Sequence, residues 1–402
     1  MDDLSLLGPC SLNLCRASPG GTVLHALKHT STRSPIWISA AETSADMHGA
    51  GLVHALHSQA PDTPLLGMGG AGMRAAPFTA LFRAEDLSVM GLTEVLSALP
   101  RIVSLYARIK KALRRHRPSC VVLLDAPDFH FRVAKMAHSL GIPVIYYISP
   151  QVWAWRTYRV HFLRRYVHQL LCIFPFEQDF FASHGLEVAF VGHPLLEHMD
   201  LSSLDQIREV PDRIGLLPGS RRKEIAALLP RFAQAARLIL RHRPSASFVL
   251  CRADGVAREE LLSLWPRDIP VHIADFAHRF SELKACSLVL SASGTATLEC
   301  AVLGLPTLVA YRISWLSYTI ARTVIDVPYI SMPNLILNQG VYPEYIQQRV
   351  RGGVLAAQAV DWLEHPEKRY AIRDRLQDIR SMLGAHTAST TAARLILDTA
   401  AG

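Results

Sequence analysis

The most regular feature of this sequence is an alternation of short apolar runs with longer stretches of helical character. The runs in the first half are Ile36 to Ser39, Cys120 to Leu124, Val144 to Ile148, Leu170 to Phe174 and Val188 to Val191. Near-continuous apolar runs separated by helices are typical of parallel strands that are buried on both faces. The first half therefore predicts a parallel sheet covered by helices on both sides.

The same alternation starts again after a polar stretch near residues 200 to 212. The second series consists of Ile214 to Leu217, Phe248 to Cys251, Val271 to Ile273, Leu288 to Leu290 and Thr307 to Ala310. A chain of 402 residues is long enough for two ordinary domains. We therefore predict two Rossmann-like, doubly wound α/β domains, which bind ligands beyond the carboxyl ends of their strands.

The pattern also predicts the domain boundaries. Residues 1–34 are rich in Ser, Thr, Pro and Gly without a clear period, so we expect a poorly ordered extension there. The N-terminal domain is expected over 35–205 and the C-terminal domain over 206–365. The remaining residues, 366–402, are expected to form C-terminal helices.

Composition narrows the range of partners. Half of the residues are hydrophobic and 19% are charged, which is typical of a globular protein. Lys and Arg outnumber Asp and Glu by 42 to 34, and this basic balance favours nucleic acid, an anionic membrane or phosphorylated small molecules. The seven cysteines form no CxxC pair, and we find no signal peptide and no membrane-spanning run, so we expect a cytoplasmic protein with reduced thiols.

A candidate diphosphate cradle lies in the second half. The sequence over 287–312 reads as strand, turn, helix and strand, and its turn contains Ser293, Gly294 and Thr295. Glycine lets backbone N–H groups approach a ligand, and the start of the next helix offers unpaired donors. Glu299, one helical turn further, could accept two ribose hydroxyls. An ordinary capped turn remains the alternative interpretation.

A second candidate phosphate turn follows the first strand of this half. Small residues, among them Ser220, are followed by a series of cations, which suits a phosphate group. We expect Arg221 to face a leaving diphosphate. The alternative is a basic helix start on the surface, which the helix dipole slightly disfavours.

Acidic residues follow two strands of the first half. Glu42 and Asp46 lie where a helix should begin. The alternative to a functional role is helix capping, and capping suits Asp46 better than Glu42. Asp125 comes at the carboxyl end of its strand, where a carboxylate can accept a proton from an attacking hydroxyl. A turn-capping role suits the neighbouring Asp128 better.

A basic amphipathic stretch provides a candidate membrane contact. Apolar residues recur at helical spacing between Leu92 and Leu113, Pro100 starts or kinks this helix, and Arg101 to Arg117 contains seven Lys or Arg and no acid. An apolar stripe edged by cations suits docking on an anionic membrane, although a solvated helix face is the usual alternative. The candidate acyl contacts are Val89, Met90, Leu92, Leu96 and Trp153.

Metal chemistry is not indicated. The 18 histidines are scattered without zinc-binding spacing, and the pair formed by Asp125 and Asp128 has the wrong spacing for the DxD element of metal-dependent glycosyltransferases. We expect no metal and no resident cofactor.

Several segments together resemble the lipid-A-disaccharide synthase family of GT-B glycosyltransferases. They are AETSADMHGAGLVHAL, LSVMGLTEVL, LLDAPDFHFRVA, YYISPQVWAWR, FPFEQDFF, FVGHPL, LLPGSRRKEI, SASGTATLEC and YISMPNLIL. Each match is weak alone, but their number and order over roughly 36–340 are specific. The family's first loop usually has glycines where this chain has Ala41 and Ala45, so the loop is expected to differ slightly if either glycine adopts a positive φ.

The resemblance implies a reaction and a site. The family joins a UDP-2,3-diacylglucosamine donor to a 2,3-diacylglucosamine 1-phosphate acceptor, which gives a β-1′,6-linked disaccharide and UDP. It implies functional roles for Glu42, Asp125, Arg221, Glu299 and Asn334, with Asp125 as the base or as an otherwise essential residue. It also implies metal independence, peripheral contact with the inner membrane, and a C-terminal region that returns to the N-terminal domain or exchanges between the protomers of a homodimer.

Two other interpretations stay open. A UDP-N-acetylglucosamine epimerase or another GT-B transferase would share the UDP cradle, but an epimerase has no use for a basic amphipathic region. A non-catalytic lipid- or nucleic-acid-binding protein would fit the charge, but it would not need two phosphate cradles. We therefore expect no nucleic-acid partner.

Overall fold

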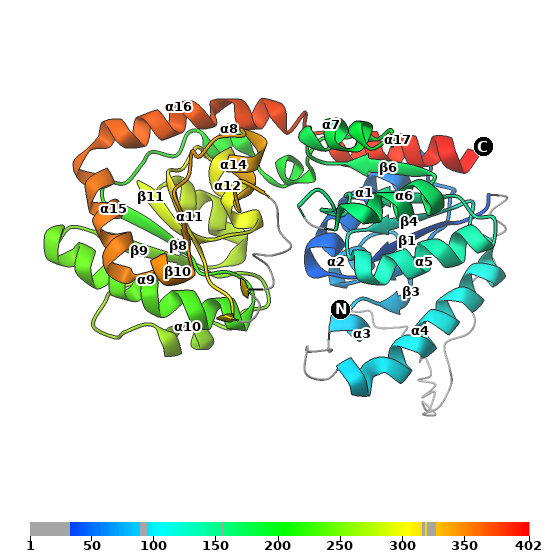
Figure 1. Cartoon of the computed structure of the whole chain (residues 1–402), viewed down its shortest axis with the longest axis horizontal. Helices are drawn as coiled ribbons and strands as arrows, with labels where there is room; N and C mark the ends of the chain where they lie inside the picture. Colours follow the sequence, from blue (N-terminus) through cyan, green and yellow to red (C-terminus); the bar gives the residue numbers. More distant parts are fainter. Residues whose placement is uncertain (1–32, 89–94, 155, 316–317, 320–326, 402) are drawn as a thin grey trace, which may run out of the picture. The chain divides into compact units, whose positions relative to one another are not determined.

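The computed structural model describes residues 33–88, 95–154, 156–315, 318–319 and 327–401 (Figure 1). Nearly all of the predicted N-terminal extension lies outside these residues, as do Val89, Met90 and Leu92. The predicted domain boundaries stay predictions, and the two sheets that form within residues 33–402 are described in turn.

The first half forms a parallel sheet of seven strands in the order β3-β2-β1-β4-β5-β6-β7. The strands are β1 (Ile36–Ala40), β2 (Leu65–Gly69), β3 (Thr79–Arg83), β4 (Cys120–Leu124), β5 (Val144–Tyr147), β6 (Gln169–Cys172) and β7 (Ala189–Phe190). All neighbouring strands pair in parallel, with β1 and β4 at the centre. The five predicted strands of this half are present, and β2 and β3 are additional to them.

Helices of the first half connect these strands. They are α1 (Thr43–Gln59), α2 (Ala71–Ala75), α3 (Glu85–Ser88), α4 (Val95–His116), α5 (Pro127–Ser139), η1 (Thr157–Arg159), α6 (Val160–Tyr166) and α7 (Phe176–Ser183). Two short helices, η2 (Pro194–His198) and α8 (Leu201–Leu204), lead toward the second half. Parallel strands need such crossovers, because each strand must restart at the same edge of the sheet.

The second half forms a parallel sheet of six strands in the order β10-β9-β8-β11-β12-β13. The strands are β8 (Arg213–Leu217), β9 (Ser247–Cys251), β10 (His272–Ala274), β11 (Leu288–Ala292), β12 (Thr307–Tyr311) and β13 (Glu344–Ile346). Every pair is parallel. The predicted fold class, two doubly wound parallel sheets, is therefore confirmed.

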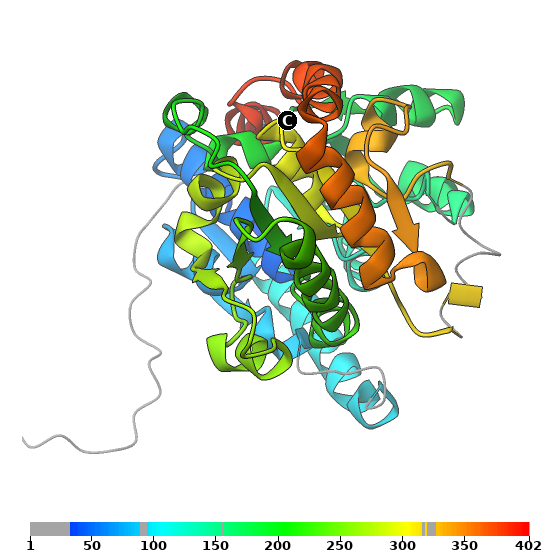
Figure 2. The same cartoon turned by 90° about the vertical axis from the view of Figure 1, so that its left-hand side faces the viewer.

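Helices of the second half lie around this sheet and continue to the C-terminus. They are α9 (Arg222–His242), α10 (Arg258–Leu264), η3 (Phe276–His278), α11 (Arg279–Lys284), α12 (Thr295–Val302), α14 (Met332–Ile336), η4 (Gln347–Arg349), α15 (Gly352–Glu364), α16 (Pro366–Met382) and α17 (Ala388–Ala401). Figure 2 shows α9 and α15 side by side on one face of the sheet, where they pack against each other.

The last two helices pack on different sheets. Helix α16 contacts α12, α14 and α15 of the second half, whereas α17 packs against α1 of the first (Figure 1). The side-chain amide of Gln59 donates to the carbonyl of Thr390 at 3.0 Å, and Ile396 is fully buried. The chain therefore returns to its first half before it ends.

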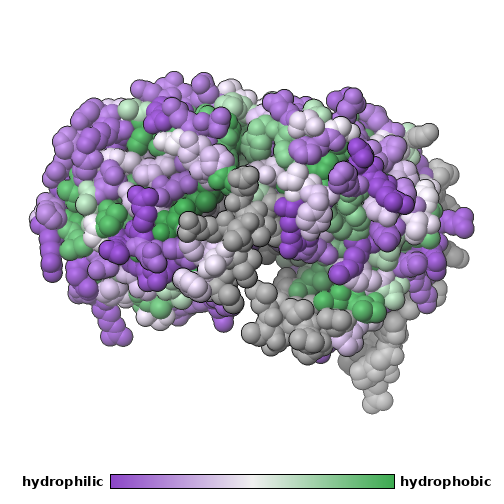
Figure 3. Space-filling model, in the orientation of Figure 1, coloured by the Kyte–Doolittle hydropathy of each residue, from purple (hydrophilic) through white to green (hydrophobic). Residues whose placement is uncertain are grey.

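The basic amphipathic stretch forms helix α4, which begins at Val95 and contains Pro100 in its interior. Leu105, Ile109 and Leu113 are buried, and the helix packs on α5, so this part of the predicted apolar stripe belongs to the protein core. The side chain of Leu96 lies outside the described residues. No helix in the described part of the chain is long and apolar enough to cross a membrane. On the face viewed in Figure 3, hydrophobic residues surface only in small patches between hydrophilic ones.

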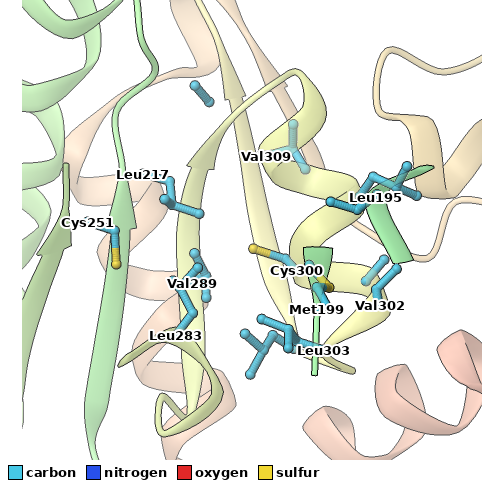
Figure 4. Packing of buried hydrophobic residues seen from close by; sticks show 14 of the residues in the cluster. Leu195, Met199, Leu217, Cys251, Leu283, Val289, Cys300, Val302, Leu303 and Val309 are labelled. Atoms are coloured by element: carbon cyan, nitrogen blue, oxygen red, sulfur yellow. The ribbon is translucent and has the colours of Figure 1, made fainter. Parts of the chain in front are cut away.

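Buried thiols are part of the core of the second half. In Figure 4, Cys251 and Cys300 lie among Leu217, Val289 and Val309, which come from strands of this sheet. Burial raises the pKa of Cys251 to about 12, so its thiol stays protonated at neutral pH. The five cysteines among the described residues are all free and buried. They act as apolar packing groups.

Candidate active site

Asp125 follows β4 in an uncommon backbone conformation. Asp125 and Ala126 have φ angles of 50° and 46°, in the left-handed region that residues other than glycine rarely adopt. Two hydrogen bonds hold the Asp125 carbonyl, one from the Tyr146 hydroxyl at 2.6 Å and one from His130 Nδ1 at 2.7 Å. The main chain is thus fixed where the side chain leaves the sheet.

His130 connects this turn to the central strand β1. Because Nδ1 faces a carbonyl oxygen, it carries the proton, and Nε2 accepts a hydrogen bond from the Ser39 hydroxyl at 2.9 Å. Burial lowers the pKa of His130 to about 4, so the ring stays neutral and keeps this tautomer. No local pattern in the sequence indicates this contact, which spans 91 residues.

The Asp125 carboxyl group itself is suited to proton transfer. Burial, together with the negative charge of Glu42, raises its pKa to about 6. A carboxylate with a pKa this close to neutral accepts a proton more readily than an ordinary aspartate does. The predicted base therefore has both a fixed position and a matched pKa.

The two acids at the start of α1 have different surroundings. Glu42 is exposed, and its side chain caps no helix. Asp46 is buried and accepts hydrogen bonds from the backbone N–H groups of Gly70 and Gly72 at 2.7 Å and of Met73 at 3.1 Å. Asp46 therefore caps a helix, as the alternative interpretation held, but the helix is α2, and only Glu42 stays available to a ligand.

The alanines that replace the family's glycines fit this loop. Ala41 and Ala45 are buried, and neither has a positive φ angle. At neither position does the loop of this chain adopt the conformation that would need glycine, and whether it differs from the family's loop stays a prediction.

The turn after β11 is open toward a ligand. Gly294 has φ 152° and ψ −160°, a region that only glycine adopts readily, and nothing lies within 4 Å of the position that a Cβ would take. No side chain caps α12, and Thr295 is exposed. Ser293 donates its hydroxyl to the carbonyl of Ile330 at 2.9 Å. The uncapped helix start fits an anion.

Arg221 lies in the neighbouring turn after β8, next to the exposed Ser220. Its side chain is 77% exposed and pairs with Glu224 at 2.9 Å. The hydrogen bond that Arg221 donates to Glu224 raises the pKa of Arg221, and the charge of Glu42 also raises it. Glu42 is therefore close enough to influence both Asp125 and Arg221. An exposed pair of this kind contributes at most about 1 kcal/mol, so a phosphate can replace Glu224 as the partner.

Glu299 is buried one turn into α12. Arg279 contacts its Oε1 atom at 3.2 Å, and the Arg279 guanidinium lies 3.7 Å and 3.9 Å from the ring centroids of Phe276 and Phe280. Burial raises the pKa of Glu299, whereas Arg279 opposes this shift. Arg279 occupies one carboxylate oxygen, and Oε2 stays available to a hydroxyl donor.

Asn334 is bonded entirely within the protein, and its expected role in ligand binding stays a prediction. Its Nδ2 donates to the Tyr342 carbonyl at 2.8 Å and to Glu344 Oε1 at 2.9 Å, while its Oδ1 accepts from the N–H groups of Val341 and Tyr342 at 2.9 Å and 2.8 Å. These four bonds use the whole capacity of the amide. Asn334 is fully buried and acts by holding the loop that carries Ile330, the acceptor for Ser293.

A buried glutamate that the sequence analysis missed organises the loop after β5. Glu177 receives hydrogen bonds from the Ser149 hydroxyl, the Trp153 indole at 3.1 Å, and the N–H groups of Ile173 and Phe174 at 3.2 Å and 3.1 Å. Burial raises its pKa to about 7. Trp153 is thus anchored through its indole N–H, and its predicted acyl contact stays a prediction.

Histidine, cysteine and acidic side chains occur throughout the described ranges. No group of three or more His, Cys, Asp or Glu side chains within them is arranged to hold an ion.

Solved structures with the same fold bind or transfer sugars. A UDP-GlcNAc 2-epimerase from Neisseria meningitidis, solved with UDP-GlcNAc, has a TM-score of 0.62 at 14% identity over 90% of this chain and 99% of its own. A glycosyltransferase of kitacinnamycin has a TM-score of 0.63 at 14% identity over 91% and 99%. Fold and site together therefore define a GT-B type α/β protein.

Sequence comparison identifies the family. The family model described as lipid-A-disaccharide synthetase matches residues 36–396. The lipid-A-disaccharide synthase of Trichlorobacter lovleyi is 36% identical over 90% of this chain and 96% of its own, and that of Myxococcus xanthus is 35% identical over 90% and 97%. The chain belongs to the lipid-A-disaccharide synthase family, and it is a glycosyltransferase.

Proposed function

We propose that this enzyme transfers the diacylglucosaminyl group of UDP-2,3-diacylglucosamine to 2,3-diacylglucosamine 1-phosphate. The products are UDP and a β-1′,6-linked tetraacyl disaccharide 1-phosphate. Family membership supports the identity of a sugar-nucleotide donor and a lipid acceptor. The observation that carries the chemistry is the fixed Asp125 carboxyl group with a pKa raised to about 6.

The reaction is a single displacement with inversion. Asp125 takes the proton of the acceptor's 6-hydroxyl while the hydroxyl oxygen forms its bond to the donor's anomeric carbon. The bond between that carbon and the diphosphate oxygen breaks, and UDP leaves with the electron pair. Arg221 and the uncapped start of α12 offset the charge that develops on UDP. These groups allow catalysis without a metal.

The donor nucleotide binds along the carboxyl edge of the second sheet. The diphosphate lies at the turn formed by Ser293, Gly294 and Thr295, with Ser220 and Arg221 beside it. Glu299 accepts the ribose hydroxyls through the oxygen that Arg279 leaves free. Open space at Gly294 and the uncapped helix support this placement.

The acyl chains place the reaction at the surface of the inner membrane. The exposed cations Arg101, Arg108 and Lys111 of α4 support contact with anionic lipid. Val89, Met90, Leu92 and Leu96, which come before them, are proposed to receive acyl chains. The family resemblance also implies a homodimer that exchanges its C-terminal region, and the terminal helix α17, which packs on α1 of its own chain, is the segment that would be exchanged.

UDP release tests the reaction. Purified enzyme is mixed with UDP-2,3-diacylglucosamine in detergent and EDTA, with and without the monosaccharide 1-phosphate. Release that requires the acceptor is expected, and Asp125→Asn should reduce it by about 10²- to 10⁴-fold. Asp128→Asn is the matched control, because Asp128 is exposed and pairs with Arg156 and Arg159 on the surface. Full activity of Asp125→Asn, or epimerisation of soluble UDP-GlcNAc, would contradict the proposal.

A further inference from the structure

A second basic site lies in the second half of the chain, between α9, α15 and the segments that follow β12 and β13. It is a cavity of about 560 Å³, within the range of about 300–1,000 Å³ that is usual for ligand pockets. Its lining residues are Pro230, Arg231, Gln234, Arg312, Gln348, Val350 and Arg351. Three arginines and no acidic residue line it, and we call it the arginine pocket.

The local backbone is arranged to bring these arginines together. Gln347, with a φ of 52°, exchanges two hydrogen bonds with the backbone of Ile313, each 3.1 Å long, and so ties the segment carrying Arg312 to the one carrying Arg351. Gly352 lets α15 approach α9, because a Cβ at this position would lie 2.6 Å from the Gln234 side chain. Figure 2 shows these two helices in contact.

Within the described ranges, no acidic side chain pairs with the arginines of the arginine pocket. Arg231 donates to the carbonyl of Ala227, and Arg351 donates to the carbonyl of Gln348 at 2.9 Å, so both bond to neutral acceptors. Burial lowers the pKa of Arg231, and the positive charge of Arg312 lowers it further. Like charges that are gathered in a partly buried site are unfavourable without an anion.

The second cavity of this half is lined differently. Each of its arginines and its lysine pairs with a carboxylate, since Arg373 pairs with Glu209, while Arg380 and Lys284 both pair with Asp205. A basic cavity that has its own carboxylates needs no external anion. The arginine pocket therefore differs from this cavity, because no acidic residue is among its described lining residues.

We infer that the arginine pocket binds a phosphate group. Guanidinium groups are planar, permanently charged and able to donate two parallel hydrogen bonds to phosphate oxygens. Arg231 lies ten residues beyond Arg221, the residue before α9, and this spacing places it about 15 Å along the helix axis from the proposed diphosphate turn. The inference does not depend on the proposed transfer reaction.

The phosphate has two sources with the same chemistry, a soluble phosphate and a phospholipid headgroup. Trp315 follows Arg312 by three residues and is 72% exposed, and exposed tryptophans are typical of membrane interfaces. The experiment therefore has one arm for each source.

The soluble arm titrates inorganic phosphate into full-length enzyme that is saturated with UDP, by calorimetry against sodium chloride at matched ionic strength. Arg312→Gln is expected to weaken phosphate binding about tenfold, since it removes one charge-assisted contact. Arg241→Gln is the matched control. Arg241 is exposed on α9, the helix that carries Arg231, and lies outside the pocket. Its affinity for phosphate should equal that of the wild type.

A second variant tests the same inference independently of whether Arg312→Gln folds. Gln234→Glu places a carboxylate of nearly the same shape among the three arginines. It is expected to raise Tm in phosphate-free buffer, because it supplies the missing counter-ion, and to weaken phosphate binding about tenfold or more. Destabilisation of the protein by this added carboxylate would contradict the inference.

The lipid arm measures co-sedimentation with phosphatidylcholine vesicles that contain or lack phosphatidylglycerol. If the source is a lipid, Arg312→Gln and Gln234→Glu reduce binding to the anionic vesicles, and Arg241→Gln does not. If the source is soluble, these variants affect phosphate binding alone. Both results support the inference. It is overturned if all four proteins bind phosphate and vesicles equally.

Discussion

Asp125 illustrates how a single residue acquires its chemistry from distant parts of the chain. Its pKa of about 6 results from burial and from the charge of Glu42. A base must be ionised to act, so kcat/KM should be full above this pKa and fall about tenfold per pH unit below it. A rate profile between pH 4 and 8 measures this limb.

Glu42→Gln tests the electrostatic cause. Removal of the neighbouring negative charge favours the ionised form of Asp125, so the acidic limb of the kcat/KM profile should move to lower pH. A profile that keeps its midpoint while its height falls would show that Glu42 acts on the substrate and not on the pKa of Asp125.

Asn334 acts through the loop that it holds. Asn334→Asp keeps the shape of the side chain but removes both N–H donors. The Tyr342 carbonyl then loses its partner, and the new carboxylate lies against the carboxylate of Glu344. We expect a loss of about 1–3 kcal/mol in the free energy of unfolding, measured by urea denaturation. A residue that only contacted UDP would lower the affinity for UDP and leave the urea midpoint unchanged.

At the scale of the element, Asp46 shows that a helix can be capped by a side chain from another helix. It binds three N–H groups at the start of α2. Asp46→Ala should cost about 1–2 kcal/mol in the free energy of unfolding, since caps of this kind contribute that much. Thermal or urea denaturation measures this loss. An unchanged stability would show that Asp46 does not stabilise α2 as a cap.

Gly294 governs the open turn before α12. Gly294→Ala forces a side chain into a conformation that costs about 1–3 kcal/mol, and its methyl group points into the open space proposed for the diphosphate. We expect both a lower Tm and a weaker affinity for UDP, the latter by calorimetry. If the folded variant binds UDP with unchanged affinity, the diphosphate does not bind at this turn.

The sequence predicted elements wherever the pattern of burial was simple. The central strands are buried on both faces, and β4 matches the predicted run residue for residue. Strand β2 was missed because glycines interrupt it, and β3 because only one of its five residues is buried at the edge of the sheet. The three residues of β13 are too few to form a pattern.

At the scale of the whole molecule, the candidate site could be predicted only in part. Positions after strands, such as Asp125 and Gly294, follow from the rule for parallel sheets. The groups that hold them come from remote segments, as in the contact of Ser39 with His130 or of Ser149 with Glu177. Such contacts depend on tertiary packing and leave no local pattern.

The return of the chain to its first half makes the last helix a structural part of that half. Ile396 is fully buried where α17 packs on α1, and Ile396→Ala should cost about 2–5 kcal/mol in the free energy of unfolding. Hydrogen exchange should show reduced protection in α1 and unchanged protection in α9. Arg394→Ala is the matched control, because Arg394 is exposed on the same helix.

The same contact distinguishes a monomer from an exchanged dimer. If α17 packs on its own chain, the Tm of the wild type is independent of protein concentration. If it packs on a partner, the Tm rises with concentration, because association then stabilises the fold. Sedimentation of wild type and Ile396→Ala completes the test. The substituted protein should shift toward monomer only if α17 is exchanged, whereas a loss of stability at constant mass would assign the helix to its own chain.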